Sequence, residues 1–321
     1  PIKPGAILMA KIGAALTKNH RKILLKPAII DNNMLAAAPR GSVSSDYYYW
    51  LWQTIDLTDH QNISSVPSVN MESLKSVKVN VPDKKVQDAI SKFLAGKVDI
   101  IGKMVTTKNL TRTHLSELRT VIITELIFGA GASTMNIKLR RIAVLKTTKR
   151  TAQANSSVIT LENVESWTGR IFGYTKPDSV SGELVEYQKG DVLFNKLRPY
   201  LAKAHVAQSD GLCTGEMLVL RPDESKITPE YLFYYLTSKK IIDEINVTTY
   251  GVKMPRANWD YIGSLSINLP TIDEQKRIVD ELELQLKKID ETDSLLQKSV
   301  SYLEEYRTSL ISNVITGKVE V

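Results

Sequence analysis

The sequence predicts an α+β fold in which two tandem α/β domains are separated by two long helices that form an antiparallel coiled coil. Three observations predict it. The chain contains two copies of one sequence pattern, each copy begins with short segments that favour β-strands, and each copy ends in a long stretch without proline. Together they favour two similar globular domains, each followed by its own helix.

An internal repeat organises the chain. The residues around Gly5 match those around Gly190 at an offset of 185, and residues 67–129 match residues 255–317 at an offset of 188 without a gap. A register without gaps over such a length is hard to obtain by chance, so we expect two copies of one module. Residues 137–187 have no counterpart before the first copy, and we therefore expect the first copy to be N-terminally truncated.

Each copy contains strands first and a helix last. In the second copy, residues 158–161, 191–194 and 217–220 are short apolar runs bounded by turn-forming residues, which is typical of strands. Thr228 suits the N-cap of a short helix that we expect to reach Leu236. The predicted segments are residues 1–82 for the truncated first domain, 83–130 for the central helix, 131–270 for the second domain and 271–321 for the C-terminal helix.

The two long stretches without proline carry an apolar repeat of seven residues. Such a repeat is typical of coiled-coil helices, and two of them in one chain are expected to pair with each other. Antiparallel pairing would put the two domains at opposite ends of a rod. The seam positions, which would pack between the helices or against partner subunits, are Leu94, Ile101, Leu115 and Ile122 in the first helix and Leu282, Ile289, Leu296, Leu303 and Leu310 in the second.

Charge and cysteine content narrow the class of protein. The 321 residues include 42 Lys and Arg against 35 Asp and Glu, a net charge of +7 that favours a polyanionic partner. The one cysteine, Cys213, excludes an intrachain disulfide, and the four scattered histidines make a metal site unexpected. No apolar run is long enough to span a membrane and no signal peptide is visible, so we expect a cytoplasmic protein without a membrane partner.

Two basic stretches and two loops are candidates for binding nucleic acid. Basic residues beside polar and aromatic ones suit phosphate contacts, and arginine suits readout of guanine. The alternative for each is a solvated basic surface or a structural turn with exposed cations. The candidate DNA-binding residues are Lys11, Lys18, Arg21 and Lys22 in the first stretch, Lys149 and Arg150 in the second, Lys196, Arg198, Tyr200 and Lys203 in one loop, and Lys253 and Arg256 in the other.

No catalytic motif is recognisable. The glycine-rich phosphate-binding loop and the dinucleotide-binding fingerprint are both missing, and Cys213 lies in an apolar context with no histidine nearby. The adjacent acids at Asp223 and Glu224 lack the spacing of a metal clamp. The sequence therefore predicts neither catalytic residues nor metal ligands.

Five short motifs resemble one known family. They are residues 190–200, residues 215–222, Met254-Pro255-Arg256, Leu269-Pro270 with Glu274-Gln275, and residues 310–318. Together they resemble the specificity subunit of type I restriction–modification enzymes. Residues 11–16 depart from the pattern because they lack the Arg-Pro-Tyr of residues 198–200, so the base-reading residues of the first copy are the least defined.

The resemblance implies a function in DNA methylation and in defence against foreign DNA. Each domain would be a target-recognition domain that reads one half of a bipartite, asymmetric double-stranded DNA target, and the paired helices would set the gap between the halves. Two methyltransferase subunits would dock on the helices, and restriction subunits that combine motor and nuclease would join them. The resemblance assigns no catalytic residue to this chain. It assigns S-adenosylmethionine, ATP and magnesium to the partners, and it places the complex in a bacterial or archaeal cytoplasm.

One alternative from a different class stays open at this point. A helical scaffold that bridges acidic partner proteins through its basic faces, without binding DNA, would share the repeat, the long helices and the net charge. Binding to duplex DNA that weakens steeply with salt distinguishes the two.

Overall fold

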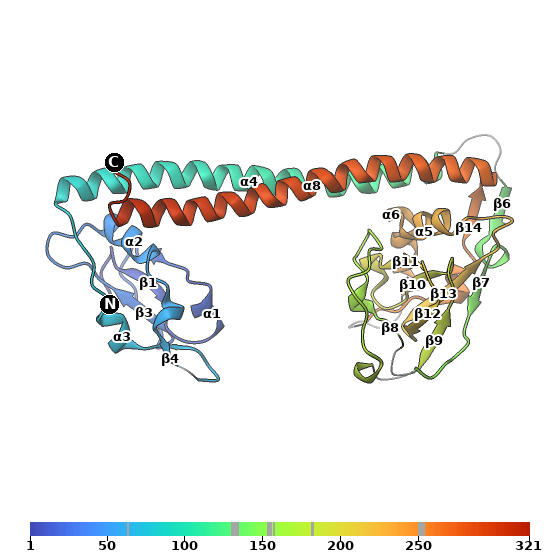
Figure 1. The fold of residues 1–321 in the computed structure, drawn as a ribbon, viewed down its shortest axis with the longest axis horizontal. Coiled ribbons are helices and arrows are strands. Elements are labelled where there is room, and N and C mark those ends of the chain that lie inside the picture. Colours follow the sequence, from blue (N-terminus) through green and yellow to red (C-terminus); the bar gives the residue numbers. More distant parts are fainter. Residues whose placement is uncertain (63, 130–134, 153–155, 157, 181–182, 250–253) are drawn as a thin grey trace. The chain divides into compact units, whose positions relative to one another are not determined.

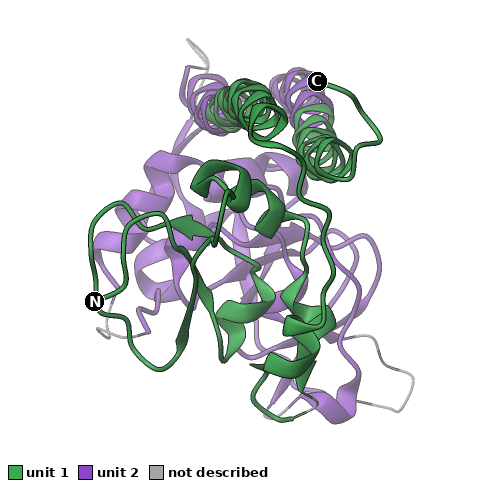
Figure 2. Cartoon of the chain, turned by 90° about the vertical axis from the view of Figure 1, so that its left-hand side faces the viewer, with its two compact units in different colours: residues 1–112, 294–321 green, residues 113–293 purple. Residues whose placement is uncertain are grey.

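The computed structural model describes residues 1–62, 64–129, 135–152, 156, 158–180, 183–249 and 254–321 (Figure 1). They form two compact units: unit 1 contains residues 1–112 and 294–321, and unit 2 contains residues 113–293 (Figure 2). Each unit contains β-sheet, short helices and a part of both long helices. Within the described ranges, no helix is both long and apolar enough to cross a membrane.

Unit 1 is built on a small antiparallel sheet with the strand order β2-β1-β3. Ile7 in the central strand is fully buried, and it pairs with Ile23 on one side and Ala37 on the other. Ser44 caps the following helix, its hydroxyl accepting a hydrogen bond from Tyr47 N at 3.3 Å. The elements are β1 (Ile7–Ala10), α1 (Ala14–Thr17), β2 (Lys22–Ile23), β3 (Met34–Ala37), α2 (Ser45–Gln53), η1 (Leu57–His60), β4 (Gln61–Asn62), β5 (Ser68–Val69), α3 (Met71–Lys75) and the first part of α4 (Lys84–Phe128).

Unit 2 contains a larger antiparallel sheet, β11-β10-β13-β7, and two small sheets, β8-β12-β9 and β14-β6. All four residues of the central strand β10 are buried. The first elements are β6 (Met135–Lys138), η2 (Leu139–Arg141), β7 (Ala143–Lys146), β8 (Val158–Ile159), η3 (Leu161–Asn163), η4 (Pro177–Ser179), β9 (Leu184–Tyr187), β10 (Val192–Asn195) and η5 (Pro199–Leu201). The others are β11 (Ala204–Val206), β12 (Gly211–Thr214), β13 (Met217–Pro222), α5 (Pro229–Thr237), α6 (Lys239–Val247), α7 (Trp259–Ile262), β14 (Ser266–Leu269) and the first part of α8 (Ile272–Ile315).

The long helices pair antiparallel in each unit. In unit 1, Ile90 and Leu94 near the start of α4 share a core with Leu310 near the end of α8. In unit 2, Ile127 near the end of α4 shares a core with Leu282 near the start of α8. The predicted α+β fold, with two sheet-containing domains and two long antiparallel helices, is therefore confirmed.

The apolar seam is regular in α8 and shifts in α4. Leu282, Ile289 and Leu310 are buried, whereas towards the end of α4 the buried residues are Ile123 and Ile127. The shift of one residue from the predicted Ile122 follows from helix geometry, because a straight helix with 3.6 residues per turn drifts from a strict seven-residue repeat. The other predicted seam residues are Leu94 and Ile101, which are buried, and Leu115, Ile122, Leu296 and Leu303, which are half-buried.

The two units repeat the same buried hydrogen bonds. Gln87 and Gln275, related by the offset of 188, are both fully buried. Gln87 Oε1 accepts from Ser44 N, and Gln275 Oε1 accepts from Thr228 N, both at 2.9 Å. Each Nε2 also donates to the carbonyl five residues earlier, again at 2.9 Å. In both units this amide joins the start of a long helix to the cap of a short one, which supports two copies of one module.

Candidate nucleic-acid interface

Two loops that the sequence indicates separately lie side by side in unit 2. The first is residues 196–202, which follow β10, and the second is residues 254–257. Arg198 N donates to Pro255 O at 2.7 Å, and Ala257 N donates to Lys196 O at 2.8 Å. We call these two segments the recognition loops. Their pairing brings Lys196, Arg198 and Arg256 to neighbouring positions.

The backbone of the first recognition loop is held in a strained conformation. Arg198 has a φ of 53°, in the left-handed region that is uncommon for residues other than glycine. The buried side chain of Asn195 bonds both backbone groups of Leu197, with its Oδ1 accepting from Leu197 N at 3.2 Å and its Nδ2 donating to the carbonyl. A fixed turn of this kind presents the Arg198 side chain from a defined position, which suits recognition of a ligand.

The candidate side chains on these loops differ in whether protein atoms already bind them. Lys203 Nζ donates to Leu161 O at 2.7 Å, and Arg256 Nη2 lies 2.9 Å from Glu216 Oε1. Lys196 and Arg198 form no side-chain hydrogen bond or ion pair with the described residues. Tyr200 is 44% exposed. Lys196, Arg198 and Tyr200 are thus open to a ligand, whereas Lys203 and Arg256 also support the loops. Lys253 lies outside the described residues.

Unit 1 has the same backbone arrangement without the arginines. Gly13 N donates to Pro67 O at 2.7 Å, as Arg198 N does to Pro255 O in unit 2. Gly13 also has a positive φ, 82°. Ser68 pairs with Ile12 as Arg256 pairs with Leu197. In unit 1, Gly13 and Ser68 therefore stand where Arg198 and Arg256 stand in unit 2.

The basic residues of unit 1 are not equally accessible. Lys18 and Lys22 are exposed and Lys11 is half-buried, whereas Arg21 is only 4% exposed. The Arg21 guanidinium donates to Asn19 Oδ1 at 2.6 Å and to the carbonyls of Ile55 and His20 at 2.9 and 3.2 Å. Burial lowers the pKa of Arg21 to about 10. A contact between Arg21 and DNA would require these bonds to open.

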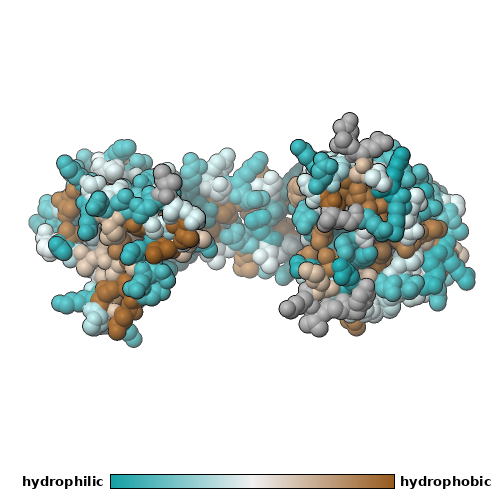
Figure 3. Space-filling view, turned by 90° about the horizontal axis from the view of Figure 1, so that it is seen from below, coloured by the Kyte–Doolittle hydropathy of each residue, from teal (hydrophilic) through white to brown (hydrophobic). Residues whose placement is uncertain are grey.

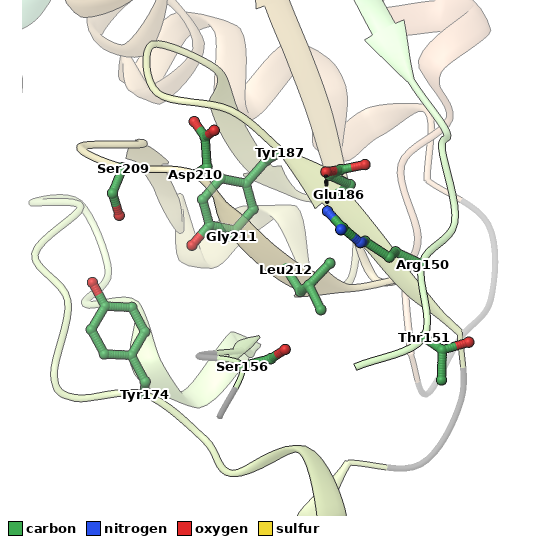
Figure 4. Close-up of a pocket in the computed structure, with 10 residues that line it drawn as sticks. All are labelled: Arg150, Thr151, Ser156, Tyr174, Glu186, Tyr187, Ser209, Asp210, Gly211 and Leu212. Carbon is green, nitrogen blue, oxygen red and sulfur yellow. Dashed lines mark hydrogen bonds and ion pairs between the residues drawn. The ribbon is translucent and has the colours of Figure 1, made fainter. Parts of the chain in front are cut away.

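A hollow of about 610 Å³ in unit 2 is lined by residues of the paired strands β9 and β12 and of the segments around Arg150 and Tyr174 (Figure 4). Arg150 lines it, and its Nη1 lies 2.7 Å from Glu186 Oε1; Lys149 lies 2.7 Å from Glu183. All four side chains are at least one-third exposed, so these pairs contribute little to stability and can exchange for a phosphate. The lining residues are Arg150, Thr151, Ser156, Tyr174, Glu186, Tyr187, Ser209, Asp210, Gly211 and Leu212.

We expect Gly211→Ala to destabilise unit 2. A Cβ atom at Gly211 would lie 2.4 Å from the Tyr187 hydroxyl and 2.6 Å from its Cζ, and the Tyr187 side chain is 2% exposed and has little room to move. The expected loss is about 1–3 kcal/mol in the free energy of unfolding. Chemical denaturation followed by tyrosine and tryptophan fluorescence measures it. Gly215→Ala is the control, because its nearest neighbour would be Glu183 O at 3.5 Å; equal stability of the two variants would contradict the close packing.

A charged cluster that the sequence did not indicate joins α4, α8 and the segment around Arg170 within unit 2. Arg119 of α4 places Nη1 2.7 Å from Asp290 Oδ1 of α8, and Arg170 binds the other oxygen of that carboxylate. The backbone near Arg170 leads to the recognition loops, since Trp167 N donates to Ala202 O at 3.1 Å. Arg119 and Asp290 are 171 positions apart, so no local pattern could have indicated the pair.

Two further titratable side chains of unit 2, Cys213 and His205, lie in surroundings that favour their neutral forms. Cys213 is fully buried, and burial raises the pKa of its thiol to about 12. His205 Nδ1 lies 2.9 Å from Gly169 O, and burial lowers the pKa of His205, which favours the neutral imidazole. Across the part of the chain that the structure describes, no group of three or more His, Cys, Asp or Glu side chains could hold a metal ion.

Comparison with known proteins relates part of the chain to one family. Residues 150–299 match the model of the type I restriction modification DNA specificity domain. The chain is 25% identical over 159 residues to the EcoDI specificity subunit of Escherichia coli, across 49% of this chain and 35% of that subunit. It is 19% identical over 326 residues to the MjaVIII specificity subunit of Methanocaldococcus jannaschii, across 92% of this chain and 75% of that subunit. The aligned part thus spans about a third of the EcoDI subunit.

Two solved structures share the fold. One comes from work on complex assembly and conformational transition of the type I R-M system; it has a TM-score of 0.78 and 14% identity, and covers 99% of this chain and 83% of that chain. The other is the HsdS subunit of Thermoanaerobacter tengcongensis, with a TM-score of 0.55, 16% identity and coverage of 99% and 82%. Residues 150–299 therefore belong to the type I specificity-domain family. The predicted resemblance to the specificity subunits of type I restriction–modification enzymes is confirmed.

Proposed function

We propose that this chain is the DNA sequence-specificity subunit of a type I restriction–modification complex. Each unit would read one half of a bipartite, asymmetric target, and the paired helices would set the gap between the halves. The observation that carries the proposal is the shared backbone geometry at Lys11 and Lys196, where the same hydrogen bonds hold a lysine at the end of the central strand. The same backbone geometry with different side chains suits two units that read different bases.

Arg198 is the residue that we propose as the main base reader of unit 2. Its guanidinium has no partner among the described residues, and arginine can donate two parallel bonds to a guanine in the major groove. Lys196 beside it suits a phosphate, and the exposed ring of Tyr200 can contact sugar or base. In unit 1, the exposed Lys18 and Lys22 are the proposed phosphate contacts.

The proposal assigns chemistry to partner subunits. Methyltransferase subunits would dock on the helices and use S-adenosylmethionine, and restriction subunits would use ATP and magnesium. The chain itself would supply recognition and assembly and no catalytic residue. The antiparallel packing of the helices in each unit supports a scaffold role, because it leaves their outer faces open to other proteins.

Salt dependence tests whether the chain contacts DNA phosphates. With about six phosphate contacts, we expect the affinity for the target duplex to fall roughly a thousandfold between about 50 and 200 mM salt. Lys22→Gln should reduce the slope of log affinity against log salt by about one, since one counterion fewer is released. Fluorescence anisotropy with a labelled duplex measures both.

The control is Lys103→Gln, which removes an exposed lysine on the helix α4, away from the sheet of unit 1. Its slope should equal that of the unaltered chain. Binding that is insensitive to salt would favour the alternative of a protein-bridging scaffold. A slope that both substitutions change equally would show a diffuse basic surface in place of defined phosphate contacts.

A further inference from the structure

A carboxylate of helix α8 binds two arginines from different parts of unit 2. Arg119 Nη1 of α4 donates to Asp290 Oδ1 at 2.7 Å, and Arg170 Nη2 donates to Asp290 Oδ2. The side chains of Arg119 and Asp290 are 13% and 30% exposed, whereas that of Arg170 is 54% exposed. The Arg119–Asp290 pair therefore belongs to the packing of the two helices, and Arg170 attaches a surface segment to that pair.

Arg170 ends a short turn whose backbone is closed on itself. Glu165 N donates to Arg170 O at 2.8 Å, and Gly169 N donates to Glu165 O at 3.2 Å. A Cβ atom at Gly169 would lie 2.6 Å from Ala204 O and 2.7 Å from a ring carbon of α5, so the turn packs directly against β11 and α5. We call residues 165–170 the bridging turn.

The bridging turn holds the end of the first recognition loop. Trp167 N donates to Ala202 O at 3.1 Å, and both residues have a positive φ, 68° and 46°. Such left-handed conformations are uncommon outside glycine and persist only where the surrounding structure holds them. Leu201 N in turn donates to Arg198 O at 3.0 Å. A short series of backbone contacts thus joins the bridging turn to the residue that we propose as the base reader.

The segment that follows Arg170 is anchored only weakly by apolar contacts. Ile171 is half-buried, and Phe172 and Tyr174 are 62% and 55% exposed. In the right-hand part of Figure 3, apolar areas of the surface of unit 2 lie between hydrophilic ones. On such a surface a charge-assisted hydrogen bond is the more specific anchor, because it fixes both the distance and the direction of the groups that it joins.

We propose that Asp290 is a positioning residue for base recognition by unit 2. Through Arg170 it fixes the bridging turn on the helices, and the bridging turn fixes the loop from which Arg198 extends. The inference rests on the proposed function of Arg198, and it adds that a carboxylate of α8 determines how sharply unit 2 discriminates between bases. The rival explanation is that Arg170 contacts DNA directly and that Asp290 only competes with DNA for it.

Two substitutions separate positioning from direct contact. Arg170→Gln releases the bridging turn, and Asp290→Asn removes the charge that holds it while both arginines stay in place. Mapping of methylated bases in the host genome supplies the target, and anisotropy titrations of the full chain compare the intact duplex with duplexes that carry one changed base. We expect both variants to lose roughly fivefold in the ratio of these affinities, in the half of the target that unit 2 reads. The ratio in the other half should stay unchanged.

Hydrogen exchange without DNA, followed by mass spectrometry, gives a second readout. Both variants should exchange faster than the unaltered chain at residues 165–170 and 199–203, and equally fast in β10 and β13. Faster exchange throughout β10 and β13 would overturn the inference, because Asp290 would then only stabilise the unit. Arg277→Gln is the control, since it removes an arginine that pairs with Glu274 on the same helix, and it should change neither readout.

The DNA titrations distinguish the remaining outcomes. A loss of discrimination in Arg170→Gln alone, with equal or tighter binding by Asp290→Asn, would overturn the inference in favour of direct contact. Discrimination by the unaltered chain that neither substitution changes would refute this inference and leave the proposed function standing. Equal affinity of the unaltered chain for all duplexes would refute the proposed function and, with it, the role of Asp290 in base recognition.

Discussion

Arg198→Gly is expected to lower the affinity of the chain for its target duplex by about ten- to a hundredfold, because a bidentate arginine–guanine contact contributes roughly 1–3 kcal/mol. Glycine is the suitable replacement, since the φ of 53° at this position suits glycine and Gly13 occupies the equivalent position in unit 1. The substitution removes the side chain and leaves the loop backbone unstrained.

The effect should be confined to one half of the target. Mapping of methylated bases in the host genome supplies the target sequence, and anisotropy titrations then use duplexes with single base changes in each half. Arg198→Gly should relax discrimination in one half only. Arg277→Gln is the control, because Arg277 lies exposed on α8 and pairs only with Glu274 among the described residues. An equal loss of base discrimination in both halves would contradict two units that read the target independently.

Gln275→Leu is expected to destabilise unit 2 by about 2–4 kcal/mol. Leucine fills a similar volume, but it removes the hydrogen bonds to Thr228 N and to the carbonyls of Lys226 and Pro270. Each buried group left without a partner costs roughly 1–3 kcal/mol, and water can relieve part of the loss at the half-buried Lys226 carbonyl. Gln87→Leu should also destabilise unit 1, but by less, since the bonds of Gln87 to Ser44 N and Pro82 O correspond to two of these three.

Urea denaturation with hydrogen exchange of both units measures these two losses separately. Gln297→Leu is the control, because Gln297 is exposed on α8 and its replacement should change the free energy of unfolding by less than about 0.5 kcal/mol. A large loss for Gln275→Leu with none for Gln87→Leu would show that the two copies no longer share this structural role.

The sequence predicted the elements that depend on local patterns. The repeat and the absence of proline predicted two long helices, and the structure has them at Lys84–Phe128 and Ile272–Ile315. Thr228 caps the short helix as expected, its hydroxyl accepting from Tyr231 N at 3.2 Å. The sequence predicted a strand over residues 158–161, whereas in the structure only Val158 and Ile159 form a strand.

Contacts between distant residues could not be predicted in this way. The pairing of Leu197 with Arg256 follows from the closed fold, and no spacing in a single sequence indicates it. The same holds for Arg21, which donates to the carbonyl of Ile55 34 positions away, and for Arg150, whose partner Glu186 lies 36 positions away. Charge composition marks such residues as basic but does not tell a buried arginine from an exposed one.

The most direct test of the central claim is the affinity of the unaltered chain for duplexes in which each half of the target is scrambled in turn. If each of the two units reads one half, a duplex with either half scrambled should bind more weakly than the intact target. Scrambling both halves should leave only salt-sensitive, non-specific binding. Full affinity for a duplex that retains one half alone would contradict the account, because the second module would then contribute no recognition.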